Sequence, residues 1–228
     1  MFINIRTFDN YFKTRFTMKK LTYLLIFLVL IVIVSCKKTD SVKPVITLKG
    51  NNPDVVEWGS SAKYSEPGAV VTDDMDGTLT YTVDSTVNMY SAANYTVTYK
   101  ASDKAGNATT ATRTVIVDAA LYLKGIFTVK NYIGIVLNST YTDTLSVTTT
   151  NNVLQFNRFA FYKNAHVLAN LTGTTINIPQ QTDTCGIPAR PVTFSGTGSF
   201  VADTAFIINY TVVDSSAVFT GHGEYKLN

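Results

Sequence analysis

Three acidic side chains within four positions are the residues of this chain best suited to chemistry. Residues 71–80 read VTDDMDGTLT, so Asp73, Asp74 and Asp76 precede Gly77. Carboxylates grouped in this way could bind a calcium ion, or could supply the acid and the base of a hydrolase. The third interpretation is a turn between two strands, because Asp-Gly tolerates the positive φ that tight turns require.

The spacing of this acidic stretch favours the turn. With Gly77 as the sixth residue of an EF-hand calcium loop, Thr72 would be first and Val83 twelfth, and neither is the carboxylate that the loop needs. The paired carboxylates of a hydrolase face each other across a cleft, whereas these three share one loop. We therefore predict a turn and no cofactor. The alternative left open is a peripheral calcium ion on Asp73, Asp74, Asp76 and Asp103.

Other chemical groupings in the chain are sparse. Cys185 could act as a nucleophile if His166 or His222 lay beside it, but a lone cysteine in an exported β-rich domain is usually incidental. His222 and Glu224 would share one face of a strand, and Glu224 is the single glutamate of the C-terminal half. Hydrolysis needs a positioned acid and base or an activated nucleophile. We therefore predict that the chain is not an enzyme and has no catalytic residues.

The N-terminal segment predicts export. Residues 18–38 read MKKLTYLLIFLVLIVIVSCKK, a basic start followed by an apolar run over 21–34. The run is shorter than the about 20 residues that span a bilayer, and it is typical of a signal peptide. It ends in Ile33-Val34-Ser35-Cys36, which resembles the lipobox of bacterial lipoproteins.

The lipobox resemblance implies a lipid-anchored protein. Residues 1–35 would be removed as the signal peptide, Cys36 would carry the lipid, and residues 36–43 would form the tether. Met1–Thr17 fit no targeting pattern, so Met18 is an alternative start. Several acyl chains together anchor a protein stably to a membrane. We therefore expect the bacterial outer membrane, with the cell surface favoured over the periplasmic face.

Removal of this segment reverses the sign of the net charge. The full chain has 19 basic and 16 acidic residues, a formal charge of +3. The first 35 residues hold five of the basic residues and one of the acidic ones, so 14 basic and 15 acidic residues remain. This nearly neutral remainder gives no electrostatic basis for binding nucleic acid.

Alternation of apolar and polar residues predicts an all-β protein. In the run Tyr95–Tyr99 the tyrosines and the valine share one face and the threonines the other, as in a strand buried on one side. Similar short runs occur at Val45–Leu48, Leu79–Val83 and Thr114–Val117, with Gly, Pro, Asn and Asp between them. This spacing is typical of an antiparallel sandwich, which we place at 44–118.

The first half also resembles a known family, the bacterial Ig-like domain of surface proteins and of pesticidal crystal proteins. The matching residues include Pro44–Leu48, Glu66-Pro67-Gly68, Asp76-Gly77, Tyr95–Tyr99 and Ala105-Gly106-Asn107. The resemblance implies an immunoglobulin-like β-sandwich in which the acidic stretch is an inter-strand loop. Trp58 departs from the family, which usually has a smaller aliphatic residue at this place.

The second half, residues 121–228, contains about eight predicted strands. They fall at Gly125–Val136, Tyr141–Thr148, Val153–Tyr162, Val167–Gly173, Thr175–Pro179, Val192–Val201, Ala205–Val213 and Ala217–Leu227, with turns at Asn138-Ser139 and Lys163-Asn164 among others. Short connections favour an antiparallel meander, either a β-barrel or a β-sandwich. The apolar phase changes across Asn157-Arg158, which predicts a bulge. Gly196 and Gly198 are interpreted as strand kinks, since no helix follows them as a phosphate loop requires.

The second half is similar to the C-terminal β-domain of two-part lipoproteins from polysaccharide-utilising bacteria. The similar elements are Ile176–Gln181, Phe194–Gly198 and Ile207–Tyr210. The resemblance implies an accessory surface lipoprotein that binds polysaccharide beside an outer-membrane importer complex. Trp58 and Tyr90 are the binding candidates, because exposed aromatic rings can stack on sugars. The alternative function is a structural or adhesive module in which the Ig-like domain is a spacer.

Overall fold

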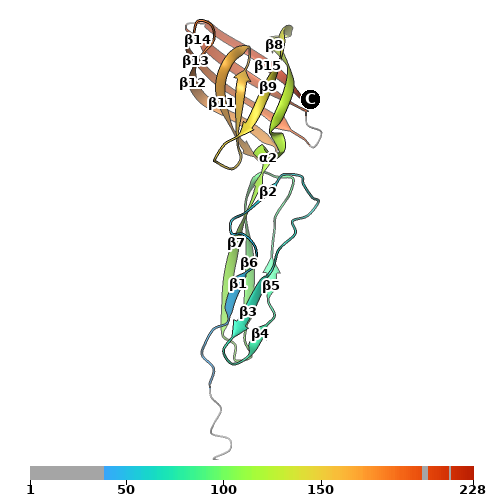
Figure 1. Cartoon of the computed structure of the whole chain (residues 1–228), viewed down its shortest axis with the longest axis vertical. Coiled ribbons are helices and arrows are strands. Elements are labelled where there is room, and N and C mark those ends of the chain that lie inside the picture. Colours follow the sequence, from blue (N-terminus) through green and yellow to red (C-terminus); the bar gives the residue numbers. More distant parts are fainter. Residues whose placement is uncertain (1–38, 202–204, 216) are drawn as a thin grey trace, which may run out of the picture. The chain divides into compact units, whose positions relative to one another are not determined.

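The strands of the computed structural model follow the alternation of apolar and polar side chains. The structure describes residues 39–201, 205–215 and 217–228, so the predicted signal peptide, the start at Met1 or Met18 and the lipidation of Cys36 lie outside the described residues. Lys43–Asn228 form one unit with a shared buried core, in which an Ig-like region precedes a barrel (Figure 1). Within the described residues, no helix is long and apolar enough to cross a membrane.

Two sheets form the Ig-like region. One has the order β1 (Val45–Leu48), β3 (Ala69–Asp73) and β4 (Gly77–Leu79), and the other has the order β2 (Asp54–Glu57), β7 (Ala108–Asp118), β6 (Ala93–Ser102) and β5 (Thr82–Asp84). Neighbouring strands are antiparallel except β2 and β7. Val97 and Tyr99 of β6 are fully buried, as is Val115 of β7. The predicted sandwich and the buried face of Tyr95–Tyr99 are therefore confirmed.

The strand predicted over Leu79–Val83 is interrupted. The chain leaves β4 after Leu79 and joins the other sheet as β5 at Thr82. Tyr81 lies at this crossing, where its hydroxyl accepts a hydrogen bond from the backbone N–H of Ala69 (3.0 Å) and its ring centroid is 5.9 Å from that of Tyr99. Apolar and polar residues alternate without a break over Leu79–Val83, although the chain changes sheet there. For this reason the alternation predicted one strand.

A buried ion pair connects the loops of the Ig-like region to its core. The Arg113 side chain is fully buried, and its Nε donates to Glu66 Oε1 and to the Tyr99 hydroxyl, both at 3.1 Å. Its other nitrogens donate to the backbone carbonyls of Lys49 and Asn51. The planar guanidinium suits this fixed set of acceptors, since it presents several N–H groups in one plane.

Eight antiparallel strands form the barrel. In chain order they are β8 (Gly125–Ile133), β9 (Val136–Val147), β10 (Val153–Phe159), β11 (Tyr162–Thr172), β12 (Thr175–Cys185), β13 (Arg190–Phe200), β14 (Ala205–Asp214) and β15 (Ala217–Leu227). Each strand pairs with the next, and β15 pairs with β8 to close the ring. The predicted meander is confirmed, and of its two predicted forms the structure is the barrel.

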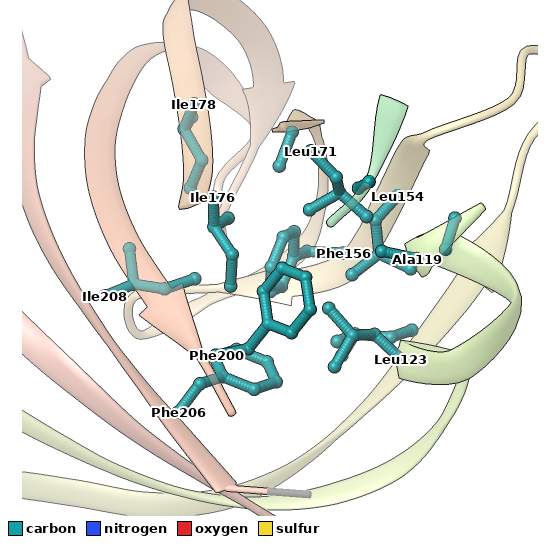
Figure 2. Close-up of a cluster of buried hydrophobic side chains, with 14 of the residues drawn as sticks. Ala119, Leu123, Leu154, Phe156, Leu171, Ile176, Ile178, Phe200, Phe206 and Ile208 are labelled. Atoms are coloured by element: carbon teal, nitrogen blue, oxygen red, sulfur yellow. The ribbon is translucent and has the colours of Figure 1, made fainter. Parts of the chain in front are cut away.

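The inward faces of the barrel strands supply an aromatic core. Figure 2 shows Phe156, Phe200 and Phe206 gathered with aliphatic side chains from several strands. Rings in this core meet edge to face, as in the pair Phe159 and Phe194, whose centroids are 5.8 Å apart at 90°. Side chains therefore fill the interior, as is usual for a barrel of eight strands.

The bulge predicted in the third barrel strand is present. The register of β10 with β11 shifts between Phe156 and Arg158. Asp143 of β9 holds the bulge, because its Oδ1 accepts hydrogen bonds from the backbone N–H groups of Asn157 (3.1 Å) and Arg158 (2.8 Å). A buried carboxylate thus fixes a local irregularity that the sequence phase revealed.

Two of the predicted turns are wrong. Asn138-Ser139 lies within β9 and Lys163-Asn164 lies within β11. The chain reverses instead at Gly134-Ile135 and at Ala160-Phe161, where Gly134 (φ 59°) and Ala160 (φ 51°) have positive φ. Short polar residues are common in turns, but here Asn138, Lys163 and Asn164 are exposed strand positions.

A single helical turn connects the Ig-like region to the barrel. This helix, α2 (Ala119–Leu123), is capped by Asp118, which accepts a hydrogen bond from the backbone N–H of Ala120 (2.9 Å). Asp118 also accepts from the backbone N–H of Asn152 (3.0 Å), and the Asn152 side chain accepts from that of Ala119 (2.8 Å). Reciprocal side-chain bonds therefore fix the chain where the sandwich ends and the barrel begins.

Candidate functional site

Of the two aromatic residues predicted to bind glycans, Trp58 is enclosed and Tyr90 reaches the surface. Trp58 is 2% exposed, and its ring centroid lies 5.4 Å from that of Tyr90, 4.9 Å from Tyr122 and 5.2 Å from Phe200. The prediction that Trp58 presents its ring to a ligand is wrong, because these aromatic neighbours cover it. Tyr90 is 45% exposed, with Trp58 packed against it in an edge-to-face contact.

The acidic stretch forms the turn that its spacing favours. Gly77 has a φ of 72°, and Asp73 Oδ1 accepts hydrogen bonds from the backbone N–H groups of Met75 (3.0 Å) and Asp76 (2.9 Å). Asp76 binds the backbone N–H (2.8 Å) and the ammonium group (2.9 Å) of Lys104, and these hydrogen bonds lower the pKa of Asp76. The ammonium group of Lys104 thus occupies the place beside the Asp76 carboxylate that a bound cation would need.

Asp103, another of the calcium candidates, is used in a similar way. Asp103 accepts hydrogen bonds from the backbone N–H and the side-chain amide of Asn107, both at 2.7 Å. Within the described residues, no three of Asp73, Asp74, Asp76 and Asp103 bring carboxylate oxygens within 4.8 Å of one another. The carboxylates of Asp73, Asp76 and Asp103 fix two loops, and the calcium ion stays a prediction.

The environment of Cys185 favours the neutral thiol. Cys185 is buried at the end of β12. Burial, together with the charges of Asp183 and Asp214, raises the pKa of Cys185 to about 11. The reactive thiolate is therefore scarce at neutral pH. His166, one of the two histidines considered as its base, has Nδ1 3.8 Å from Asp183 Oδ2.

A row of polar side chains crosses the outer face of the barrel. Strand register places its five members side by side, in the order Tyr132, His222, Asn209, Thr197 and Asn177. They come from β8, β15, β14, β13 and β12, respectively. The residues flanking Asn209 along its strand, Ile208 and Tyr210, are buried, whereas Asn209 is exposed. The five residues, here called the polar row, therefore face outward.

Four members of the polar row, all but Tyr132, line a groove in the barrel surface. A hollow of about 740 Å³ and an adjoining one of about 670 Å³ both have Thr197, Asn209 and His222 in their walls. The other side chains that bear hydroxyl or amide groups there are Thr175, Asn177, Gln180, Ser195, Ser199, Thr211 and Thr220. The groove therefore offers many neutral hydrogen-bond donors and acceptors within a small area.

Glycines shape the wall around the polar row. A Cβ at Gly196 would lie 2.7 Å from the backbone oxygen of Asn209, and one at Gly221 would lie 2.6 Å from the Tyr210 hydroxyl. Register places Tyr210 between these two glycines, and its hydroxyl donates to Asn131 Oδ1 (2.7 Å). The missing side chains therefore allow neighbouring strands to approach closely beneath the groove.

Two stacked rings stand at one end of the polar row. His222 and Tyr132 have ring centroids 4.5 Å apart and planes within 9° of parallel. The Tyr132 hydroxyl lies 3.5 Å from Glu224 Oε2, at the far limit of a hydrogen bond. The pair His222 and Glu224, considered in the sequence as an acid–base pair, is thus part of an outer-face cluster with Tyr132.

Sequence reasoning did not find the polar row. Its signal was present in part, because Thr197 lies between two glycines and His222 also lies between two glycines. Each strand alone shows only an outward polar residue, which is ordinary on a solvated face. The row exists through the register of five strands, and no local pattern specifies that register.

Comparison with known proteins identifies the first region. Residues 46–117 match the family model of the bacterial surface protein Ig-like domain, so this part of the chain is a domain of that kind. Among solved structures, a lipoprotein of Bacteroides thetaiotaomicron, BT2262, is 18% identical over 80% of this chain and 100% of that chain, with a TM-score of 0.34. A likeness this distant carries no argument about the barrel. No curated protein sequence matches the chain.

Proposed function

We propose that this chain, whose residues 46–117 are an Ig-like domain of the bacterial surface type, is a non-enzymatic envelope lipoprotein that binds glycans. In this proposal a lipid on Cys36 anchors it to the outer membrane, facing the cell surface, and the groove of the barrel captures polysaccharide for an importer. The observation that carries the proposal is the polar row within that groove.

The side chains of the groove suit sugar hydroxyl groups. The amides of Asn177 and Asn209 each have donors and an acceptor, and the hydroxyl of Thr197 between them can do either. One face of the His222 ring is stacked on Tyr132, and Asn209 is the cross-strand partner of His222. An imidazole held in this way offers its other side to the apolar C–H face of a sugar ring.

The same lining supports a binding role over hydrolysis. Glycosidases act through a pair of carboxyl groups placed on either side of the scissile bond. The described residues that line the groove include no aspartate and no glutamate. Glu224, the nearest carboxylate along β15, has its Oε2 3.5 Å from the Tyr132 hydroxyl at the edge of the row. The proposal therefore assigns contact, and no bond-making step, to this face.

Affinity electrophoresis tests glycan binding directly. The full chain in detergent is run through native gels that contain starch, xyloglucan, galactomannan, inulin or other soluble polysaccharides. At least one polysaccharide is expected to slow the chain, and Asn209→Ala and His222→Ala are expected to abolish that retardation. Thr142→Ala, an exposed position of β9 outside the groove, serves as the matched control. Unchanged migration of the wild-type chain on every polysaccharide would contradict the proposal.

The anchor is tested separately. Cells grown with labelled palmitate are expected to label the wild-type chain, whereas Cys36→Ser should remain unlabelled and leave the membrane fraction. Label on the Cys36→Ser chain would contradict the assignment of the lipid to this residue. This result bears on the envelope location alone, because the groove belongs to the barrel.

A spacer role for the Ig-like domain is the second candidate, and the contacts at its end favour it. The backbone N–H groups of Ala92 and Gly173 each donate to the carbonyl of the other at 2.9 Å. Trp58 packs against Phe200 of the barrel strand β13. Such contacts limit motion between the two regions, as a spacer requires. A protein partner that crosslinks to the barrel, with no polysaccharide retained in gels, would favour this structural role over glycan capture.

A further inference from the structure

We infer that the groove takes an uncharged polysaccharide segment laid across strands β12 to β15, and that it discriminates against acidic glycans. This inference rests on the proposed function, and it adds the class of ligand and the direction in which the ligand lies. It follows from the charge of the groove and from the spacing of the polar row.

The groove is lined by neutral groups. Its described lining includes no Asp, Glu, Lys or Arg. His222 and Tyr210 are its titratable side chains, and the Tyr210 hydroxyl is committed to Asn131 Oδ1. The groove therefore presents hydrogen-bonding dipoles but no fixed charge to its ligand.

The nearest charged side chains on the same face lie outside the lining of the groove. Glu224 of β15 and Lys130 of β8 are direct cross-strand partners. Both lie two residues along their strands from the stacked pair His222 and Tyr132, and so on the same outer face. Lys226 lies two residues beyond Glu224 on the same strand, and the charges of these side chains are screened by salt. None of the three lines the groove, so none pairs with a ligand held on the row.

An acidic glycan would lose hydration without compensation in this groove. A carboxylate or sulfate entering it gives up bound water, and transfer of an unpaired charge from water is far more costly than transfer of a hydroxyl. Charge-assisted bonds from Arg or Lys would offset that loss, but the lining offers amides and hydroxyls. The hydroxyl groups of a neutral sugar exchange hydrogen bonds to water for hydrogen bonds to the amides and hydroxyls of the groove. The balance favours the uncharged polymer.

The spacing of the polar row favours an extended ligand. Adjacent strands in a sheet are separated by about 4.8 Å, so the three steps from Asn177 to His222 cover roughly 14 Å. The groups repeat at right angles to the strands, one on each strand. A polymer that crosses the strands meets a hydrogen-bonding group at every step, whereas one that follows a single strand leaves the row after one residue.

Binding to paired panels of polysaccharides tests the inference. The full chain is titrated with neutral polymers (starch, xyloglucan, galactomannan, inulin) and with acidic ones (polygalacturonate, alginate, hyaluronan, chondroitin sulfate). We expect binding to at least one neutral polymer, little change in its Kd between about 0.05 M and about 0.5 M salt, and a roughly five- to tenfold weaker Kd in Asn209→Ala. Acidic polymers should not bind detectably.

Each outcome of that titration has a distinct meaning. Tight binding of an acidic polymer that Asn209→Ala abolishes would overturn the inference about ligand class and leave the proposed function standing. Binding of a neutral polymer that survives both Asn209→Ala and Thr197→Ala would overturn the placement of the ligand on the row. A wild-type chain that binds neither panel would overturn the proposed function itself.

A charge inserted into the row sharpens the discrimination. Thr197→Lys places an ammonium group at the centre of the groove, and Thr142→Lys places the same charge on β9 outside it. Thr197→Lys is expected to weaken neutral polymers about tenfold or more and to gain salt-sensitive binding of polygalacturonate. Thr142→Lys should do neither. Equal gains in the two variants would show that net charge alone governs acidic binding, and would overturn the claim that the groove sets the ligand class.

Discussion

The Ig-like sandwich and the barrel each bury a charged side chain, but they satisfy it differently. In the sandwich, Arg113 has a carboxylate, a hydroxyl and two backbone carbonyls as acceptors. In the barrel, Asp143 Oδ1 accepts two backbone N–H groups while its buried Oδ2 has no hydrogen-bond partner. The outer faces of the two regions differ as well, because the polar row lies on the strands of the barrel. The sandwich uses its buried polar groups to hold loops, whereas the barrel has a buried carboxyl oxygen without a hydrogen-bond partner and a polar row on its outer face.

Loss of the paired charge in the sandwich is expected to have the largest effect. Arg113→Met removes the donor shared by Glu66, Tyr99 and two carbonyls, and breaking a buried pair in this way costs about 3–5 kcal/mol. The free energy of unfolding from urea titration measures it. Arg190→Met, which breaks the more exposed pair with Asp214, is the matched control and should lose less. Equal losses of unfolding free energy in the two variants would contradict the expectation that the buried pair stabilises the fold more than the exposed one.

The under-satisfied carboxyl of the barrel should make stability depend on pH. Burial raises the pKa of Asp143 from 3.8 to about 7, although backbone hydrogen bonds from Arg158, Asn157 and Thr144 act in the opposite direction. Between about pH 4 and pH 7 the folded barrel therefore keeps a proton that the unfolded chain has released. Unfolding free energy should fall as the pH rises through this window, by on the order of 4 kcal/mol, and level off above it.

The control for this titration is Asp143→Asn. The amide keeps an oxygen for the N–H groups of Asn157 and Arg158 but cannot titrate. Urea titrations across the same pH range should lose most of the slope in Asp143→Asn. If the unfolding free energy of Asp143→Asn changes with pH as it does in the wild-type chain, other groups cause the pH dependence. That result would contradict the role given to Asp143.

Crowding beneath the groove should cost somewhat less than loss of the buried pair. In Gly221→Ala the new methyl group would meet the backbone oxygen of Tyr132 and the hydroxyl of Tyr210, an overpacking expected to cost about 2–3 kcal/mol. Gly134→Ala has open space around the methyl group and only a positive φ to oppose it, so about 1 kcal/mol is expected. Thermal unfolding of the two variants gives the comparison. A larger loss of stability in Gly134→Ala than in Gly221→Ala would contradict this expectation.

Tyr90, a binding candidate from the sequence, gives the smallest expected effect on affinity. Tyr90→Ala removes a half-exposed ring of the Ig-like region, far along the chain from the polar row. Retention of the chain in polysaccharide gels should be unchanged in Tyr90→Ala. Lost retention with an intact fold, judged by thermal unfolding, would move the binding site back to the sandwich.

The strands and the bulge could be predicted from the sequence because their signals are local. The alternation in Tyr95–Tyr99 and the phase change at Asn157-Arg158 both appear within a few residues. The enclosure of Trp58 could not be predicted, since Tyr122 and Phe200 reach it from distant parts of the chain. The turn at Asn138-Ser139 was predicted wrongly, because an outward-facing asparagine in a strand resembles one in a turn. The polar row depends on register between five strands, which no stretch of sequence contains.

The direct test of the groove is a nuclear magnetic resonance titration of the labelled chain with an oligosaccharide cut from the polysaccharide that it binds. The side-chain amide signals of Asn177 and Asn209 and the ring signals of His222 report on the polar row. The account predicts saturable shifts at these three residues, with the ring signals of Tyr90 unchanged. Saturable shifts at Tyr90, with Asn177, Asn209 and His222 unmoved, would contradict it.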